Sequence, residues 1–262
     1  MKFAIIAAGE GSRLANEGIA APKPLIEVKG EKLTDRLIRI FMDNGASEIY
    51  VICNDQTSLV SQHLAAIQRD GLGGRRVPLR FIVKSTPSSM HSFYELGKAL
   101  LFGEYSSESG AYNEPFCMTT VDTIFNEKEF AAYIAELQSS VKNGITDGLM
   151  GVTDYVDDEK PLYIGVDNNM RINGFFDEKR EAESGEQDVT YISGGIYGLT
   201  PSAFGTLERC ISRGESRMRN FQRALVADGL RLKAYPFSKV LDIDHASDIE
   251  KAEKFLQSEV TN

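Results

Sequence analysis

The chain begins with KFAIIAAGEGSRL at residues 2–14, in which an apolar run leads directly into a glycine-containing turn. A short apolar run that ends at a glycine is typical of a buried strand followed by a turn. Gly9 and Gly11 carry no side chain, so their backbone N–H groups can approach phosphate oxygens closely. Arg13 and Lys23 add two cations nearby in the sequence. We interpret the stretch as a nucleoside triphosphate site, in which the strand delivers the loop and the cations polarise the phosphates.

Two other glycine-containing nucleotide loops do not match this stretch. A Walker A loop requires Gly-Lys-Ser/Thr after four intervening residues, and a dinucleotide-binding loop requires a third glycine where Leu14 stands. An ordinary strand-to-helix turn would account for the two glycines alone. That alternative is less favoured once Arg13 and Lys23 are included.

Apolar and amphipathic segments alternate through the first half, which is typical of α/β units around a largely parallel sheet. Strands are predicted at about 2–7, 48–53, 79–83 and 116–121, and helices at Leu33 to Asn44, Ser58 to Arg69 and Met90 to Phe102. In the second half, strands are predicted at Leu149 to Thr153, Leu162 to Val166, Arg171 to Phe176 and Tyr191 to Leu199. Because few helices separate them, mixed or antiparallel pairing is expected there. Helices are predicted again at Pro201 to Ser212, Met218 to Asp228 and Ala246 to Ser258, and a mobile charged loop at Asp177 to Asp188.

The length of the chain is compatible with one domain. No Pro/Gly/Ser-rich linker and no internal repeat divides its 262 residues. We expect a single domain over residues 1–262, with a nucleotide-binding half at about 1–125 and an acceptor-binding half at about 126–262.

The charge and the cysteines exclude some classes of partner. Lys and Arg number 29 against 38 Asp and Glu, and the net charge of −9 argues against binding to nucleic acid or to an anionic membrane. Cys53, Cys117 and Cys210 lie in or beside apolar runs, so we expect buried free thiols. No signal peptide is recognised, and no apolar run approaches the ~20 residues needed to span a bilayer. We therefore expect a cytoplasmic protein; the sequence is compatible with a homo-oligomer but does not fix the oligomeric state.

The glycine loop, with Arg13, Leu14 and the later Pro22-Lys23-Pro24, resembles the signature of the sugar-1-phosphate nucleotidyltransferases, also called NDP-sugar pyrophosphorylases. The family pattern is Gly-x-Gly-Ser/Thr-Arg-Leu/Met followed by Pro-Lys or Lys-Pro. The resemblance implies an α/β, Rossmann-like three-layer sandwich with a mixed, mostly parallel central sheet, the nucleotide-diphospho-sugar transferase type. It also implies catalytic roles for Arg13 and Lys23, and nucleotide binding by Ala8, Gly9, Gly11 and Ser12.

Two acidic positions are candidates for binding Mg²⁺, which prefers one or two carboxylates plus phosphate oxygens. Asp122 ends the apolar segment 116–121, which puts its carboxylate at the edge of the sheet where α/β ligands bind, although a turn or helix-capping role is the alternative. Asp242 and Asp244 are alternate residues and would lie on the same side of an extended segment. By the resemblance, Asp122 and Asp242 hold Mg²⁺ and Asp244 assists. His245 stands where the family commonly has Thr, and we favour a capping or solvent role for it.

Three further segments resemble parts of the family that bind the acceptor and the base. Glu178 and Lys179 match a Phe-x-Glu-Lys segment whose Glu meets sugar hydroxyls and whose Lys meets the sugar phosphate; a solvated charged loop is the alternative. Gly194 and Gly195 match a strand where glycine lets a sugar lie against the backbone, although a glycine pair in a strand could equally form a bulge.

The third segment, Lys84 to Ser92, lacks the Gly-Thr-Ala of sugar-specific members. Its Ser-Met-His-Ser run, residues 89–92, is closer to the phosphocholine cytidylyltransferase-like branch. Ser89 and Ser92 would then meet the base or ribose, and Ser88 or Ser89 could instead cap a helix. Both the base and the acceptor are therefore left open.

The leading hypothesis is a Mg²⁺-dependent nucleotidyltransferase that transfers a nucleoside monophosphate from a nucleoside triphosphate to a sugar-1-phosphate, forming an NDP-sugar and pyrophosphate. A cytidylyltransferase acting on phosphocholine or a similar phosphorylated alcohol is the first alternative. A glycosyltransferase would require an Asp-x-Asp motif where only Val121-Asp122-Thr123 occurs. A nucleotide-binding regulator without catalysis is the remaining alternative, and the presence of Arg13, Lys23 and both metal-candidate segments argues against it.

Overall fold

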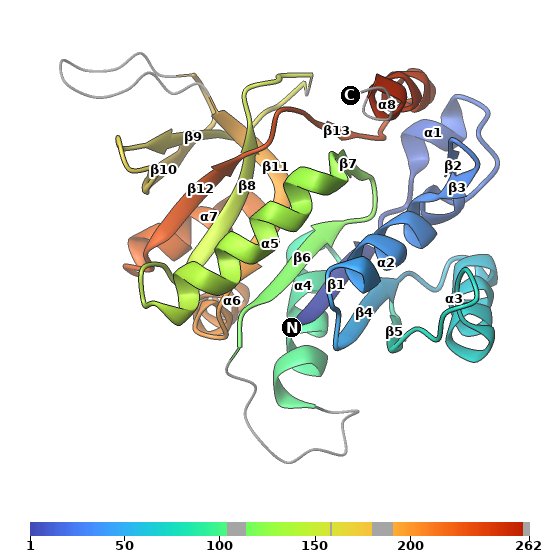
Figure 1. Cartoon of the computed structure of the whole chain (residues 1–262), viewed down its shortest axis with the longest axis horizontal. Helices are drawn as coiled ribbons and strands as arrows, with labels where there is room; N and C mark the ends of the chain where they lie inside the picture. The colour runs from blue at the N-terminus through green and yellow to red at the C-terminus, as the bar shows by residue number, and fades with distance from the viewer. Residues whose placement is uncertain (104–113, 158, 180–190, 259–262) are drawn as a thin grey trace. The chain divides into compact units, whose positions relative to one another are not determined.

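The computed structural model describes residues 1–103, 114–157, 159–179 and 191–258 (Figure 1). The chain forms two compact units. The first comprises Met1–Gly110, Met118–Ile124 and Leu241–Asn262, and the second comprises Ala111–Cys117 and Phe125–Val240. These units differ from the predicted halves at the C-terminus, because residues 241–262 belong with the N-terminal part of the chain.

The first unit is built on parallel strands. β1 (Lys2–Ala7) pairs in parallel with β4 (Glu48–Cys53), which pairs in parallel with β5 (Leu79–Val83). The end of β6 (Phe116–Thr120) borders β1 on its other side. All but the first residue of β1 and of β4 are buried, which explains why these strands are apolar without alternation. The predicted parallel α/β arrangement of this part is confirmed.

The helices predicted from the amphipathic segments of the first half of the chain are present. They are α2 (Leu33–Asp43), α3 (Ser58–Asp70) and α4 (Ser89–Phe102). The rings of Phe3 in β1 and Phe41 in α2 stack with 4.6 Å between their centroids. The α2 helix ends before Gly45, whose φ of 72° is the left-handed conformation that glycine supplies at helix ends. Close to the C-terminal helix α8 (Ala246–Ser258) lie α1 (Ser12–Asn16) and the hairpin of β2 (Glu27–Val28) and β3 (Glu31–Lys32) (Figure 1).

The second unit has mixed strand pairing, as predicted. The long strand β11 (Tyr191–Leu199) pairs antiparallel with β8 (Gly148–Thr153) and β9 (Tyr163–Val166), and β10 (Ile172–Phe176) pairs antiparallel with β9. β12 (Leu232–Pro236), which was not predicted, pairs in parallel with β8. The fold class is therefore α/β with a mixed sheet, of the Rossmann-like type that the resemblance implied.

The described residues of this unit form three helices: α5 (Glu127–Lys142), α6 (Ala203–Ser212) and α7 (Met218–Ala227). The sequence did not lead to a prediction of α5. The N-cap of this helix is Asn126, whose side chain accepts a hydrogen bond from the Glu129 amide. The helix buries Phe130 and Tyr133 in an aromatic cluster, in which the Phe130 and Phe125 rings stack at 4.6 Å.

The remaining described elements are short: η1 (Lys23–Leu25), β7 (Thr123–Phe125) and β13 (Val240–Asp242). The three cysteines are buried free thiols, as predicted, and burial raises the pKa of Cys53 to about 11. No helix in the described ranges combines the length and the apolar character needed to cross a membrane. Most of the predicted mobile loop, residues 180–188, lies outside the described residues.

Candidate active site

The glycine loop follows β1 and leads into α1. Gly11 has a φ of 63°, and a Cβ built on it would lie 3.3 Å from Cβ of Lys23. Both the left-handed backbone and the proximity of Lys23 therefore favour glycine at this position. Gly9 has no atom within 4 Å of such a Cβ, so its α-carbon faces open space.

A cavity of about 350 Å³ opens beside this loop, within the range of volumes typical of small-molecule sites. Its walls come from four segments of the first unit: residues 6–11, Lys23 with Pro24, residues 86–89 with Ser92, and residues 120–122. The cavity thus brings together Ala8, Gly9, Gly11, Ser89 and Ser92, five of the six residues predicted to bind nucleotide. Ser12, the sixth, is exposed in the first turn of α1 and does not line the cavity.

Lys23 is held at the cavity wall by two carboxylates. Its Nζ lies 2.6 Å from Oδ2 of Asp122 and 2.7 Å from Oδ1 of Asp244. Burial alone would lower the pKa of Lys23, but the two carboxylates outweigh it and raise this pKa above its usual range. Lys23 is therefore a fixed cation. Its backbone turn is fixed as well, because the buried hydroxyl of Thr34 donates to the carbonyl of Pro24 at 2.7 Å.

The two carboxylates come from segments more than a hundred residues apart in the sequence. The Val121 amide donates to the Ile6 carbonyl at 3.0 Å, and the Ile243 amide donates to the Asp122 carbonyl at 3.1 Å. These bonds align the ends of β1, β6 and β13 within the first unit. Burial would raise the pKa of Asp244, but the hydrogen bond and charge of Lys23, together with the charge of Arg13, outweigh burial and lower it. Arg13, which is exposed and does not line the cavity, also donates to Asp244, at 2.9 Å.

Asp242 stands apart from this arrangement. Ile243, between Asp242 and Asp244, is fully buried, and Asp242 is exposed. Neither acidic residue lines the cavity, but Asp244 reaches Lys23. That Asp242 and Asp244 share one side of the segment and one metal ion stays a prediction. The described residues contain no cluster of three or more His, Cys, Asp or Glu side chains that could hold a metal. The arrangement is a pair of carboxylates around one cation, and such a pair, completed by phosphate oxygens, suits Mg²⁺.

The segment at residues 86–92 forms another wall. Ser88 is the N-cap of α4 and accepts from the His91 amide at 3.4 Å, so the capping alternative holds for Ser88. Ser92 is buried, and its hydroxyl lies 2.6 Å from that of Thr86. Thr86 was not singled out from the sequence; its only signal was its place between Ser85 and Pro87 in a polar stretch.

Two residues that do not line the cavity, and that were not predicted from the sequence, bind segments of the site. Asn54, just after β4, donates to the carbonyls of Ala8 at 3.3 Å and Gly9 at 3.2 Å. Glu17, just after α1, binds the start of α8: its Oε2 accepts from the Ala246 amide at 2.6 Å, and its Oε1 lies 2.6 Å from Nδ1 of His245. Position at the end of a parallel strand could have indicated Asn54. No local pattern indicated Glu17.

The predicted acceptor residues lie in the second unit. Glu178 and Lys179 are exposed, and neither makes a hydrogen bond or ion pair to another part of the chain that the structure describes. The residue before them, Asp177, is instead paired with Arg219 and Arg223 of α7, and the Arg223 guanidinium, with that of Arg219, lowers the pKa of its carboxyl.

The glycine pair at Gly194 and Gly195 forms a bulge in β11. The register against β8 shifts between Ser193 and Ile196, and Gly195 has a φ of 68°. The backbone at this glycine pair is therefore a β-bulge, which was the alternative interpretation. Binding of a sugar against it stays a prediction.

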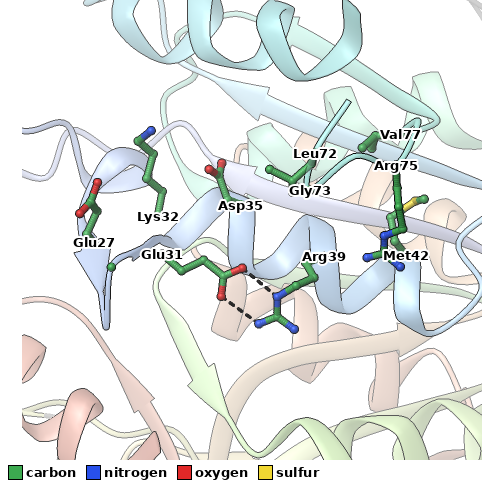
Figure 2. Close-up of a pocket in the computed structure, with 11 residues that line it drawn as sticks. Glu27, Glu31, Lys32, Asp35, Arg39, Met42, Leu72, Gly73, Arg75 and Val77 are labelled. Carbon is green, nitrogen blue, oxygen red and sulfur yellow. Dashed lines mark hydrogen bonds and ion pairs between the residues drawn. The ribbon is translucent and has the colours of Figure 1, made fainter. Parts of the chain in front are cut away.

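A second cavity, of about 290 Å³, lies in the first unit between α2, the β2–β3 hairpin and residues 72–77 (Figure 2). Its lining has equal numbers of acidic and basic residues: Glu27, Glu31 and Asp35 against Lys32, Arg39 and Arg75. Arg39 already donates two hydrogen bonds of 2.8 Å to Glu31 (Figure 2). With no excess of positive charge, this cavity does not suit a triphosphate.

Comparison with known proteins identifies the family. The family model described as nucleotidyl transferase matches residues 2–259. A UTP–glucose-1-phosphate uridylyltransferase of Haloferax volcanii is 25% identical over 265 residues, covering 100% of this chain and 98% of the relative. Among solved structures, an apo UDP-glucose pyrophosphorylase superposes with a TM-score of 0.72 at 15% identity, covering 99% of each chain. The CTP:phosphocholine cytidylyltransferase of Streptococcus pneumoniae superposes with a TM-score of 0.68 at 14% identity, covering 97% of this chain and 98% of that one.

These two structures share the fold of this chain, and the family match spans nearly its whole length, including both segments that supply the carboxylates at Lys23. The chain therefore belongs to the nucleotidyl transferase family and is a nucleotidyltransferase.

Proposed function

We propose that this enzyme transfers a nucleoside monophosphate from a pyrimidine nucleoside triphosphate to a sugar-1-phosphate, forming an NDP-sugar and pyrophosphate. The observation that carries the proposal is the cavity lined by the glycine loop, Lys23 and Asp122, together with the contact of the Lys23 ammonium to both Asp122 and Asp244. The pyrimidine base and the sugar acceptor are supported by the relatives, since the full-length relative is named for UTP and glucose-1-phosphate.

The reaction needs no protein nucleophile. An oxygen of the acceptor's phosphate attacks the α-phosphorus in line, the bond from that phosphorus to the β-phosphate oxygen breaks, and pyrophosphate leaves. The amides of Gly9 and Gly11 and the guanidinium of Arg13 would bind the β- and γ-phosphates. Lys23 would turn from its carboxylates towards the α-phosphate and the incoming phosphate, and so neutralise charge where the new bond forms.

Asp122 and Asp244 are the residues that would hold Mg²⁺ first, whereas the resemblance implies Asp122 and Asp242 as the ligands, with Asp244 assisting. Lys23 supports this assignment, because its ammonium stands in for a cation between the first two carboxylates. When bound, Mg²⁺ would neutralise the phosphate charges and orient both substrates. The residues present therefore fit a magnesium-dependent transfer.

For the acceptor, the resemblance assigns sugar hydroxyls to Glu178, the sugar phosphate to Lys179, and the sugar ring to the backbone at Gly194 and Gly195. The exposure of Glu178 and Lys179 leaves both side chains available to a ligand. We further propose that the enzyme acts in the cytoplasm, as expected from its acidic composition and its three free thiols.

A second candidate is cytidylyl transfer to phosphocholine or a similar phosphorylated alcohol. The Ser-Met-His-Ser run at residues 89–92 favours it, since Ser89 and Ser92 of this run line the cavity where sugar-specific members have Gly-Thr-Ala. The structural likeness to a phosphocholine cytidylyltransferase agrees with this candidate.

The test is pyrophosphate release with Mg²⁺, crossing CTP, UTP, dTTP, GTP and ATP with a panel of sugar-1-phosphates and with phosphocholine. Turnover with a pyrimidine triphosphate and a sugar-1-phosphate supports the proposal. Turnover only with CTP and phosphocholine would move the assignment to the second candidate. Nucleotide binding without turnover on the whole panel would favour a regulator that has lost catalysis.

A further inference from the structure

The N-terminus of α8 is bound by a residue that lies outside the cavity. Glu17 follows α1, and its two carboxylate oxygens separate their contacts: Oε2 accepts from the Ala246 amide at 2.6 Å, while Oε1 lies 2.6 Å from Nδ1 of His245. A carboxylate at a helix N-terminus satisfies amides that have no partner inside the helix and meets the positive end of its dipole.

A second carboxylate completes the cap. Oδ2 of Asp248 accepts from the amides of His245 at 2.8 Å and Asp244 at 3.2 Å. Glu17 and Asp248 together thus bind three consecutive backbone amides, those of residues 244–246. The backbone that carries the Asp244 side chain is fixed by acceptors from two different elements.

Two residues in or next to α1 bind Asp244 and the residues that follow it. Arg13, on the first turn of α1, donates to Oδ2 of Asp244 at 2.9 Å, and Glu17, just after the same helix, binds the two residues that follow Asp244. Because Oδ2 faces Arg13, the other oxygen, Oδ1, is directed to Lys23 at 2.7 Å. All of these residues belong to the first unit.

His245 stands where the family that the sequence resembles commonly has Thr. Its Nδ1 and the Ala246 amide both contact the Glu17 carboxylate, so Glu17 binds a side chain and a backbone group of the segment that follows Asp244.

We propose that Glu17 is a positioning residue of the active site: by binding the start of α8, it holds Asp244 with one oxygen towards Arg13 and the other towards Lys23. This role rests on the proposed function, in which Asp244 is a metal ligand. Residues that orient metal ligands typically change metal affinity or activity by about 10–100-fold when they are removed.

The test compares Glu17→Ala with Glu253→Ala. Glu253 also joins α8 to the rest of the first unit, since its carboxylate accepts from the Lys29 amide at 3.1 Å, but it does not approach Asp244. Mn²⁺ binding is measured by electron paramagnetic resonance without nucleotide, in the wild type and in a Lys23→Met background where no ammonium occupies the carboxylates. Glu17→Ala is expected to weaken Mn²⁺ binding about tenfold, while Glu253→Ala leaves it unchanged.

A conservative variant separates positioning from a loss of fold. Glu17→Gln keeps an oxygen for the Ala246 amide and is expected to retain most of the Mn²⁺ affinity. Equal affinity in Glu17→Ala and the wild type would overturn the proposal, and so would an equal loss in Glu253→Ala, an equal loss in Glu17→Gln, or no Mn²⁺ uptake by either background at millimolar concentrations. Absence of turnover in the wild type would refute the proposed function instead, and it leaves this comparison of metal binding intact.

Discussion

The Lys23 ammonium lies 2.6 Å from the Asp122 carboxylate, and these two side chains are only 12% and 17% exposed. Asp244 binds the same ammonium from the other side at 2.7 Å. In the proposed mechanism, Lys23 and Mg²⁺ would compete for the same carboxylates. Binding of the metal and release of Lys23 towards the phosphates would be a single exchange.

Replacing Lys23 tests this exchange. Lys23→Met should lower turnover by about 100-fold or more, because charge at the α-phosphate is no longer neutralised. The same variant should bind Mn²⁺ more tightly than the wild type, because the competing ammonium is gone. For the Mn²⁺ measurement alone, Arg13→Met is the matched control, since Arg13 contacts Asp244 from an exposed position without bridging to Asp122. Weaker or unchanged Mn²⁺ binding in Lys23→Met would contradict the exchange.

The stability of Lys23→Met should depend on metal. Two partly buried carboxylates lose their shared counter-ion, so the free energy of unfolding should fall by about 1–3 kcal/mol. Millimolar Mg²⁺ should restore most of it, because the ion takes the place of the ammonium. Thermal unfolding with and without Mg²⁺ measures both effects, and a variant as stable as the wild type without metal would be inconsistent with them.

Alanine substitutions at the two loop glycines should affect different properties, stability at Gly11 and nucleotide binding at Gly9. Gly11→Ala should lose about 1–2 kcal/mol of stability, because alanine is strained at a φ of 63° and its Cβ would approach Lys23. Gly9→Ala has open space around its Cβ, so it should keep the stability of the wild type and instead raise the KM for the triphosphate. Urea unfolding and steady-state kinetics separate the two, and a stability loss in Gly9→Ala would show that the loop is misassigned.

Asn54 should act on nucleotide binding. It donates two hydrogen bonds to the glycine loop, and each is worth about 0.5–1.5 kcal/mol, so Asn54→Ala should raise the KM for the triphosphate about three- to tenfold with a smaller change in kcat. Gln56→Ala is the control, because the side-chain amide of Gln56 donates to the exposed side chain of Glu10, and its backbone contact to Asn54 does not depend on the side chain. Equal effects of the two variants would argue against a specific role of Asn54.

The second unit should show an acid-sensitive contact. Asp147 accepts from the Nε, NH2 and backbone N of Arg231, and the Arg231 guanidinium lowers the pKa of this carboxyl. A lowered folded pKa means that the pair stabilises the protein above the unfolded pKa of about 3.9 and that this contribution is lost as the pH falls through the folded value. The stability difference between the wild type and Asp147→Asn should therefore be largest near neutral pH and shrink as the pH falls below the unfolded pKa of about 3.9.

Urea unfolding at several pH values checks this prediction. Asp154→Asn, at an exposed carboxylate of the same unit, should change stability little at any pH. A stability difference between the wild type and Asp147→Asn that grows as the pH falls would contradict the prediction.

The sequence predicted elements whose signal is local and missed features that depend on distant contacts. β1, β4 and α2 matched closely, because continuous apolar runs and a 3.6-residue stripe report burial directly. The α5 helix was not predicted, although its cap at Asn126 and the spacing of its buried residues are local features of the sequence. The placement of Asp244 on Lys23, and the Glu17 contact to Ala246, join residues more than two hundred positions apart. No local pattern encodes such contacts.

The most direct measurement follows the α-phosphate. The enzyme is incubated with Mg²⁺, a sugar-1-phosphate and a pyrimidine triphosphate labelled at the α-phosphorus, beside an Asp122→Asn control. The account predicts that the label enters the NDP-sugar while unlabelled pyrophosphate is released in equal amount, and that the control loses this transfer. Release of inorganic phosphate with a labelled diphosphate, or no transfer from any triphosphate that binds, would contradict it.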